Sequence, residues 1–195
     1  MSPGDLVYDP FVGSGSIALA CSYFGAQVLG SDLDQRVLRG FGVGRKTYNK
    51  TVSKQMEQES EQQERFNIFT NFKHYGLPLP NIFGQDVLKP MLRGSAKLDA
   101  IVCDPPYGLR ARSRGFKEDT SSNDFSVSTI YAALLQLGVD HLRVGGRLVF
   151  LFHTDESVEA ERNLFPEHPA FDFVSASQNE LTKHRVRHLI TLEKK

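Results

Sequence analysis

The sequence predicts an α/β fold with a seven-stranded, mostly parallel sheet that ends in an antiparallel hairpin. Short strand-like runs alternate with helix-favouring stretches along most of the 195 residues, which is the pattern of a parallel sheet covered by crossover helices. The last two runs, 171–178 and 185–193, are joined by a connection too short for a helical crossover, so we expect them to pair antiparallel.

Five strands are expected before the hairpin, each a short run bounded by turn or helix signals. The fourth of them, LDAIVCD, is apolar throughout, as expected of a central parallel strand. In chain order they cover 6–9, 27–32, 81–86, 98–104 and 147–152, the last after a Gly145-Gly146 turn.

Helices are expected between these strands. Residues 16–24 are helical in composition and stop at Gly25, a plausible end signal. The polar stretch 35–74 favours two helical pieces with a solvated, acidic insertion between them. Ile130, Leu134 and Leu137 share one face of a further helix.

Length and composition indicate one compact domain over residues 1–195, because an apolar content of 40% can bury a sizeable core. Lysine plus arginine (23) balances aspartate plus glutamate (23), so no global positive field attracts a polyanion. The sequence has no membrane-spanning run and no signal-peptide pattern, and Cys21 and Cys103 form no disulfide framework. We therefore expect a cytoplasmic protein in a reducing compartment.

A glycine-rich turn, DPFVGSGS at residues 9–16, connects the first strand to the first helix. Its glycines let the backbone approach a ligand closely, and the start of the helix offers free N–H groups. The turn predicts a nucleotide-type pocket. The pattern is weak alone, since a dinucleotide site or a purely structural turn would look similar.

Acidic residues follow the next two strands. Asp32 ends strand two, where a carboxylate can accept both ribose hydroxyls of a nucleoside, with Asp34 as the alternative. A plain helix cap explains Asp32 about equally well without the other motifs. Asp86 recurs at the same edge after strand three, as an acceptor for an adenine amino group or as a turn residue.

The segment Asp104-Pro105-Pro106-Tyr107-Gly108 indicates methyl transfer to an amine. An exocyclic amine is a poor nucleophile because its lone pair is delocalised into the ring. The Asp104 carboxylate and the Pro105 carbonyl can each accept one N–H and turn that lone pair towards a methyl donor. Tyr107 offers a face on which an unpaired base stacks, an interaction of about 1–3 kcal/mol. A rigid turn alone would need neither the acid nor the aromatic residue.

Two basic patches are candidate RNA contacts. The first directly follows the Pro-Pro segment and comprises Arg110, Arg112, Arg114 and Lys117, whose placement favours phosphate contacts over a merely solvated loop. The second, KHRVRH at 183–188, puts Arg185 and Arg187 on one face of a strand, where a solvated sheet edge is at least as plausible. The histidines and cysteines lack metal-ligand spacing, so we assign no metal.

These motifs resemble those of class I methyltransferases that use S-adenosylmethionine. More narrowly, DLVYDPFVGSGSIALA, FGAQVLGSDLD and DAIVCDPPYGLRA are similar to the catalytic domain of the tRNA guanine-10 N2-methyltransferases of the THUMP-containing group. The resemblance implies a Rossmann-like fold in which Asp32 holds the ribose, Asp86 reads the adenine and Asp104 to Tyr107 grip the amine. The cofactor site is expected to comprise Asp9, Pro10, Phe11, Gly13, Ser14, Gly15, Asp32, Leu33, Asp86, Val87 and Asp104.

The resemblance also implies partners. Members of the group carry a THUMP-containing RNA-binding region before the catalytic domain, so this chain is interpreted as a catalytic fragment without it. Eukaryotic members work with a small zinc-binding activator subunit, and tRNA is the expected substrate. The alternative among methyltransferases is an adenine-N6 enzyme acting on RNA or DNA, because the same Asp-Pro-Pro-Tyr motif serves both. A catalytically silent RNA-processing scaffold and a nucleotide-dependent oxidoreductase remain open.

Overall fold

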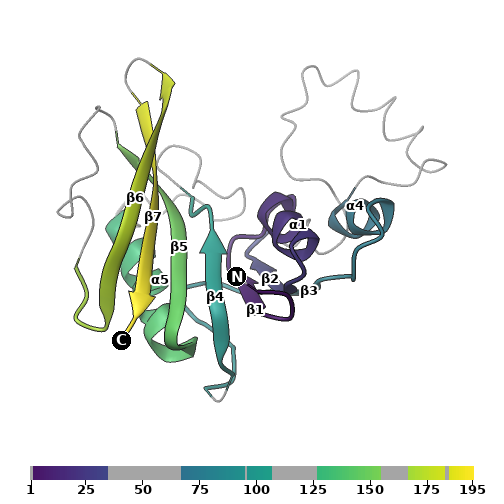
Figure 1. Cartoon of the computed structure of the whole chain (residues 1–195), viewed down its shortest axis with the longest axis horizontal. Helices are drawn as coiled ribbons and strands as arrows, with labels where there is room; N and C mark the ends of the chain where they lie inside the picture. The colour runs from purple at the N-terminus through teal and green to yellow at the C-terminus, as the bar shows by residue number, and fades with distance from the viewer. Residues whose placement is uncertain (1, 35–66, 95, 107–126, 155–166, 183–184) are drawn as a thin grey trace, which may run out of the picture.

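The computed structural model describes residues 2–34, 67–94, 96–106, 127–154, 167–182 and 185–195, and in them seven strands form one sheet. The sheet order is β3-β2-β1-β4-β5-β7-β6 (Figure 1). β1 to β5 run parallel to one another, whereas β7 pairs antiparallel with both β5 and β6. The strands are β1 (Leu6–Asp9), β2 (Gln27–Asp32), β3 (Asn81–Gly84), β4 (Leu98–Cys103), β5 (Leu142–Thr154), β6 (Phe171–Thr182) and β7 (Arg185–Lys194).

The described helices cover the two faces of this sheet. α1 (Ser16–Tyr23) and α4 (Ile68–His74) lie on one side, and α5 (Val127–His141) lies on the other (Figure 1). Tyr8, Ile101 and Phe150 face α5 in the larger core, and the smaller core lies under α1 and α4, around Val7 and Phe72. No helix in these described segments is long and apolar enough to cross a membrane.

The structure confirms the predicted sheet, with its parallel centre and terminal hairpin. Gly25, with φ of 90°, follows the first helix as expected. β3 and β4 are slightly shorter than predicted, so Asp86 and Asp104 come after their strands rather than within them. Of the predicted helical region at 35–74, α4 is described, and its Asn67–Thr70 capping box explains where it begins. Residues 35–66 lie outside the described part.

Two sequence-based expectations are wrong. The fifth strand begins at Leu142, and Gly145-Gly146 forms an irregularity within the β4–β5 ladder, where Leu98 pairs Leu142 and Ala100 pairs Arg147. β7 is no sheet edge, because it inserts between β5 and β6 and leaves β6 outermost. A hairpin can add to a sheet with either strand inward, and the spacing of its residues does not say which.

Candidate active site

Four carboxylates gather at the carboxyl ends of four adjacent parallel strands. Asp9 ends β1, Asp32 ends β2, Asp86 follows β3 and Asp104 follows β4. Ligands of open α/β sheets bind at this edge. Burial raises the pKa of Asp9 to about 7, against the hydrogen bond from the Phe11 N–H, and the charges of Asp32 and Asp104 raise it further. These charges therefore lie within electrostatic reach of one another.

The glycine-rich turn lies directly beside these carboxylates. Gly13 and Gly15 have φ values of 48° and 84°, which residues with a Cβ rarely adopt. A Cβ on Gly15 would lie 2.4 Å from the Ile68 side chain, because α4 packs against the turn. α1 begins at Ser16 with no side-chain cap, so the first N–H groups of the helix face the turn. The turn therefore presents bare backbone to a ligand.

Asp32 braces the glycine-rich turn. Its Oδ2 accepts a hydrogen bond from the Gly13 N–H at 2.9 Å, and its Oδ1 accepts one from the Asp34 N–H at 2.8 Å. A carboxylate has about four acceptor positions, so two backbone donors leave room for a ligand. Both oxygens thus engage local backbone N–H groups, whereas the helix that the plain interpretation has Asp32 cap would begin among residues 35–66, outside the described part. The neighbouring Leu33 is exposed.

Asp86 forms a turn of its own. Its Oδ1 accepts from the Leu88 N–H at 3.0 Å, and its carbonyl oxygen accepts from the Lys89 N–H at 2.9 Å. This is the turn geometry that the QDVLKP sequence allowed. The next residue, Val87, is buried in the larger core with Tyr8, so its side chain anchors the Asp86 turn to that core.

Asp104 is the one site carboxylate with an oxygen that is buried and unpaired. Its Oδ1 has no hydrogen-bond partner among the described residues. Burial raises the pKa of Asp104, and the positive charge of Arg187 on β7 opposes that rise. Pro105, which is buried, and Pro106 continue the chain from it. Tyr107, Arg110, Arg112, Arg114 and Lys117 lie outside the described residues.

Sequence reasoning missed two features of the site. The sequence leaves Arg187 either on a solvated sheet edge or in an RNA contact, and only the strand order brings its charge to Asp104. A buried network joins Tyr8, Ser31 and Gln85 below the strand ends. Ser31 lies 23 residues after Tyr8 in the sequence, and Gln85 lies 77 residues after it. Each residue is unremarkable in its own segment, so no local pattern signals the network.

Comparisons with known proteins agree with this architecture. The family model UPF0020, described as an RMKL-like methyltransferase domain, matches residues 1–167. The chain is 32% identical over 212 residues to the tRNA (guanine(10)-N(2))-methyltransferase TRMT11 of Homo sapiens, covering 97% of this chain and 43% of that protein. This chain thus spans less than half of that relative.

Solved structures show the same fold at low sequence identity. A methyltransferase from Pyrococcus furiosus has a TM-score of 0.54 and 13% identity, over 99% of this chain and 76% of that one. The T. thermophilus 16S rRNA N2 G1207 methyltransferase, in complex with AdoMet and guanosine, has a TM-score of 0.53 and 17% identity, over 100% of this chain and 38% of that one. Both are class I methyltransferase folds, and the likeness carries no more than the fold.

Proposed function

The chain belongs to the family of RMKL-like methyltransferase domains, and from that premise we propose that it transfers a methyl group from S-adenosylmethionine to the exocyclic N2 amine of a guanine in tRNA. The relatives that share about a third of its sequence are named for this reaction at guanine 10. The observation that carries the proposal is the half-buried Asp104 carboxylate just after β4, whose buried Oδ1 has no hydrogen-bond partner among the described residues.

The residues at the sheet edge fit S-adenosylmethionine, which would supply the methyl group from its sulfonium. Asp32, at the end of β2, would accept from the ribose hydroxyls with its remaining lone pairs. Asp86 would accept from the adenine amino group, and the Gly13–Gly15 turn would offer its open backbone to the methionine part. The other residues assigned to this pocket are Asp9, Pro10, Phe11, Ser14, Leu33, Val87 and Asp104.

Asp104 and Pro105 hold the amine that is methylated. The Asp104 Oδ1 accepts one N–H of the guanine N2, and the Pro105 carbonyl accepts the other. Proline has no N–H of its own to compete, and its ring keeps the loop rigid. With both N–H groups engaged, the nitrogen lone pair leaves the plane of the base and can attack a methyl group. A new N–C bond would replace the S–C bond, S-adenosylhomocysteine would leave with that bond's electron pair, and the amine proton facing Asp104 would pass to its carboxylate.

RNA recognition is assigned largely to other parts of the protein. The net charge is zero, and a sequence-independent hold on RNA requires several Lys or Arg contacts to phosphates. Tyr107 is proposed to stack on the target base, with Arg110, Arg112, Arg114 and Lys117 near its phosphates. A THUMP-containing region in the full-length protein is proposed to provide the main RNA contacts, in a cytoplasmic enzyme.

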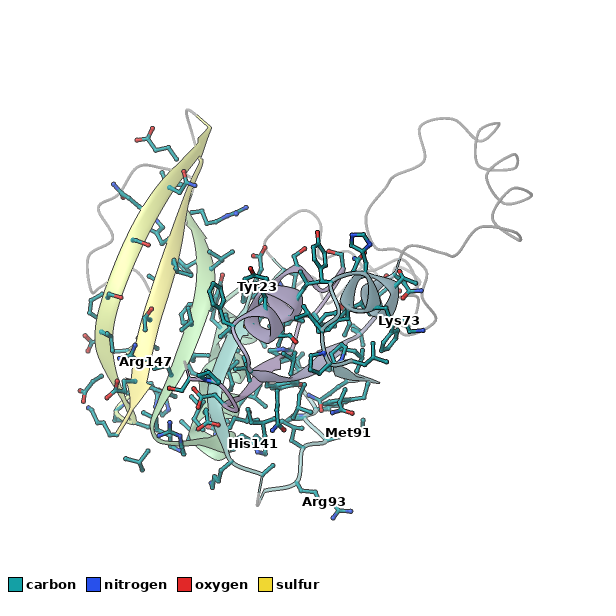
Figure 2. The ribbon with its side chains drawn as sticks, turned by 45° about the vertical axis from the view of Figure 1, so that its right-hand side comes forward. Tyr23, Lys73, Met91, Arg93, His141 and Arg147 are labelled. Carbon is teal, nitrogen blue, oxygen red and sulfur yellow. The ribbon has the colours of Figure 1, made fainter. Side chains whose placement is uncertain are left out.

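A small zinc-binding activator subunit is a proposed partner. Apolar side chains remain in solvent on the described surface, including Tyr23 and Phe24 at the end of α1 and Leu189 on β7. Figure 2 shows Tyr23 projecting from α1. A second chain that covers such groups would raise solubility. A fully active, monomeric preparation without any partner would contradict this assignment.

Product analysis tests the reaction. The full-length protein is incubated with unmodified tRNA and S-adenosylmethionine carrying a labelled methyl group, and the digested nucleosides are separated by mass spectrometry. Label is expected in N2-methylguanosine and not in N6-methyladenosine. The matched variant Asp104→Asn, which replaces one acceptor oxygen with a donor, is expected to lose at least a hundredfold in rate. Its cofactor affinity should stay nearly intact, because Asp104 borders the cofactor pocket with its side chain proposed to face the amine. Label in adenine would make the enzyme an adenine-N6 methyltransferase.

A further inference from the structure

A chain of buried hydrogen bonds joins the residues that directly precede three of the four site carboxylates, Asp9, Asp32 and Asp86. The Gln85 Nε2 donates to the Tyr8 hydroxyl at 2.8 Å, and the hydroxyls of Tyr8 and Ser31 are 2.6 Å apart. The Ser31 hydroxyl lies 3.5 Å from the carbonyl oxygen of Pro10, which it faces as a donor. The network therefore joins β1, β2 and the segment after β3.

The members of this network share one position relative to the site. Tyr8 directly precedes Asp9, Ser31 precedes Asp32, and Gln85 precedes Asp86. Neighbouring side chains of a strand point to opposite faces. The network therefore holds Tyr8, Ser31 and Gln85 on one face, and it thereby fixes the backbone that carries each following carboxylate. Tyr8 lies on the α5 side of the sheet, where its ring stacks on Phe83 with centroids 6.0 Å apart.

The network is closed to water. Tyr8 and Ser31 are fully buried and Gln85 is 5% exposed. Burial raises the pKa of Tyr8 to about 12, although its hydrogen bonds to Ser31 and Gln85 act the other way, so the hydroxyl keeps its proton throughout the physiological range. Gln85 also accepts from the Met91 N–H at 2.8 Å, which ties in the segment between β3 and β4 where Figure 2 places Met91. Buried and satisfied networks of this kind hold one geometry, because any displacement leaves a buried polar atom unpaired.

We propose that Tyr8, Ser31 and Gln85 are positioning residues for the cofactor: they hold Asp9, Asp32 and Asp86 in register so that ribose and adenine meet preplaced acceptors. The proposal rests on the cofactor site assigned above. Asp32 already accepts from the Gly13 N–H of the glycine-rich turn, and Asp86 accepts from the Leu88 N–H of its own turn. Removing a hydrogen bond of the network is expected to displace the carboxylates together with these two turns. None of the three side chains touches substrate in this scheme.

The variant Tyr8→Phe tests the proposal, since it removes one hydroxyl and keeps the ring packed on Phe83. Binding of S-adenosylhomocysteine, measured by calorimetry, is expected to weaken about five- to twentyfold. In kinetics, KM for S-adenosylmethionine rises by the same factor while kcat stays within twofold. Ser31→Ala, which keeps the Tyr8–Gln85 bond, is expected to give a smaller loss, and it replaces Tyr8→Phe if that variant does not fold.

Tyr131→Phe is the matched control, because the Tyr131 hydroxyl is also buried and donates to the Leu151 carbonyl at 3.1 Å, on the other side of β4. It is expected to lower the melting temperature about as much as Tyr8→Phe, yet to leave S-adenosylhomocysteine affinity within twofold. Equal affinity losses in both variants, or none in Tyr8→Phe, would overturn the positioning role.

A readout without ligand separates this proposal from the proposed function. Hydrogen exchange of the Gly13 and Leu88 amides, which bond to Asp32 and Asp86, is expected to accelerate at least fivefold in Tyr8→Phe and to be unchanged in Tyr131→Phe. Unchanged exchange in Tyr8→Phe refutes the network's role. If the wild-type protein fails to bind S-adenosylhomocysteine, the cofactor assignment fails, whereas the exchange result still decides whether the network positions the carboxylates.

Discussion

The charge of Arg187 on β7 acts on Asp104, which follows β4, across the intervening strand β5. Cys103 pairs Phe150, which pairs Ile190, and all three are buried on the α5 side. Alternation therefore places the odd-numbered Arg187 on the opposite side, and its charge reaches Asp104, one residue beyond the end of β4. The guanidinium lowers the pKa of the Asp104 carboxyl, against the larger effect of burial.

Arg187→Gln is expected to make methyl transfer more sensitive to acid. The proposed role requires an ionised Asp104, because the charged carboxylate is the stronger acceptor for the amine N–H, and burial already raises the pKa of this group. Removing the cation raises that pKa further, so the acid limb of the profile of kcat/KM against pH moves to higher pH. Activity at pH 6 falls more than activity at pH 8.5.

Arg147→Gln is the control for that experiment. It removes the same charge from β5, where Arg147 pairs with Glu193 at an exposed position, and it should leave the profile unchanged. Figure 2 shows Arg147 in the lower part of the strands in that view. A profile that shifts equally in both variants would mean that overall charge, and not the position of Arg187, sets the ionisation of Asp104.

Asp9 is expected to make the protein less stable as pH rises. Its pKa is about 7 in the folded state against 3.8 for the free group, so the folded state binds the extra proton between these values. Its neutral form therefore stabilises the fold below about pH 4, and that contribution is lost progressively as pH rises to 7. Asp9→Asn keeps an acceptor for the Phe11 N–H and removes the charge.

Urea unfolding at pH 5 and pH 8 measures this effect. The wild-type free energy of unfolding should fall by on the order of 2–3 kcal/mol more than that of Asp9→Asn over this interval. Equal pH dependence in the two proteins would show that Asp9 is ionised in the fold despite its burial.

The sequence predicts local features well and misses those that depend on strand order. β1 and β2 have the predicted bounds, because each is a short apolar run ended by a turn signal. The carboxylates fall at one edge because parallel strands all end there. The Tyr8–Ser31–Gln85 network and the charge of Arg187 on Asp104 depend on which strands become neighbours, and no single segment encodes that.

Gly15→Ala is expected to destabilise the protein more than Gly76→Ala. Both glycines have positive φ, at 84° and 64°, so both variants carry backbone strain. Only at Gly15 would the new Cβ collide with a neighbour, Ile68, whereas nothing lies within 4 Å at Gly76. Thermal unfolding should show about 1–3 kcal/mol of extra destabilisation in Gly15→Ala. Ile68 is itself buried, so the cost of Gly15→Ala is measured again in an Ile68→Ala background: a smaller cost there would identify the contact, and an unchanged cost would assign the loss to strain alone.

Asp32→Asn is expected to weaken cofactor binding, and Asp34→Asn is not. The amide in Asp32→Asn can still accept the Gly13 N–H with its one oxygen, so the glycine-rich turn keeps its brace while the charge is lost. Hydrogen bonds to a charged group contribute about 1.5–3 kcal/mol, so S-adenosylhomocysteine should bind roughly ten- to a hundredfold more weakly. In the fold Asp34 engages Asp32 through its backbone N–H, which the substitution Asp34→Asn retains, so calorimetry should find its affinity within twofold of wild type. The opposite ranking would move the ribose contact from Asp32 to Asp34, two residues beyond the end of β2.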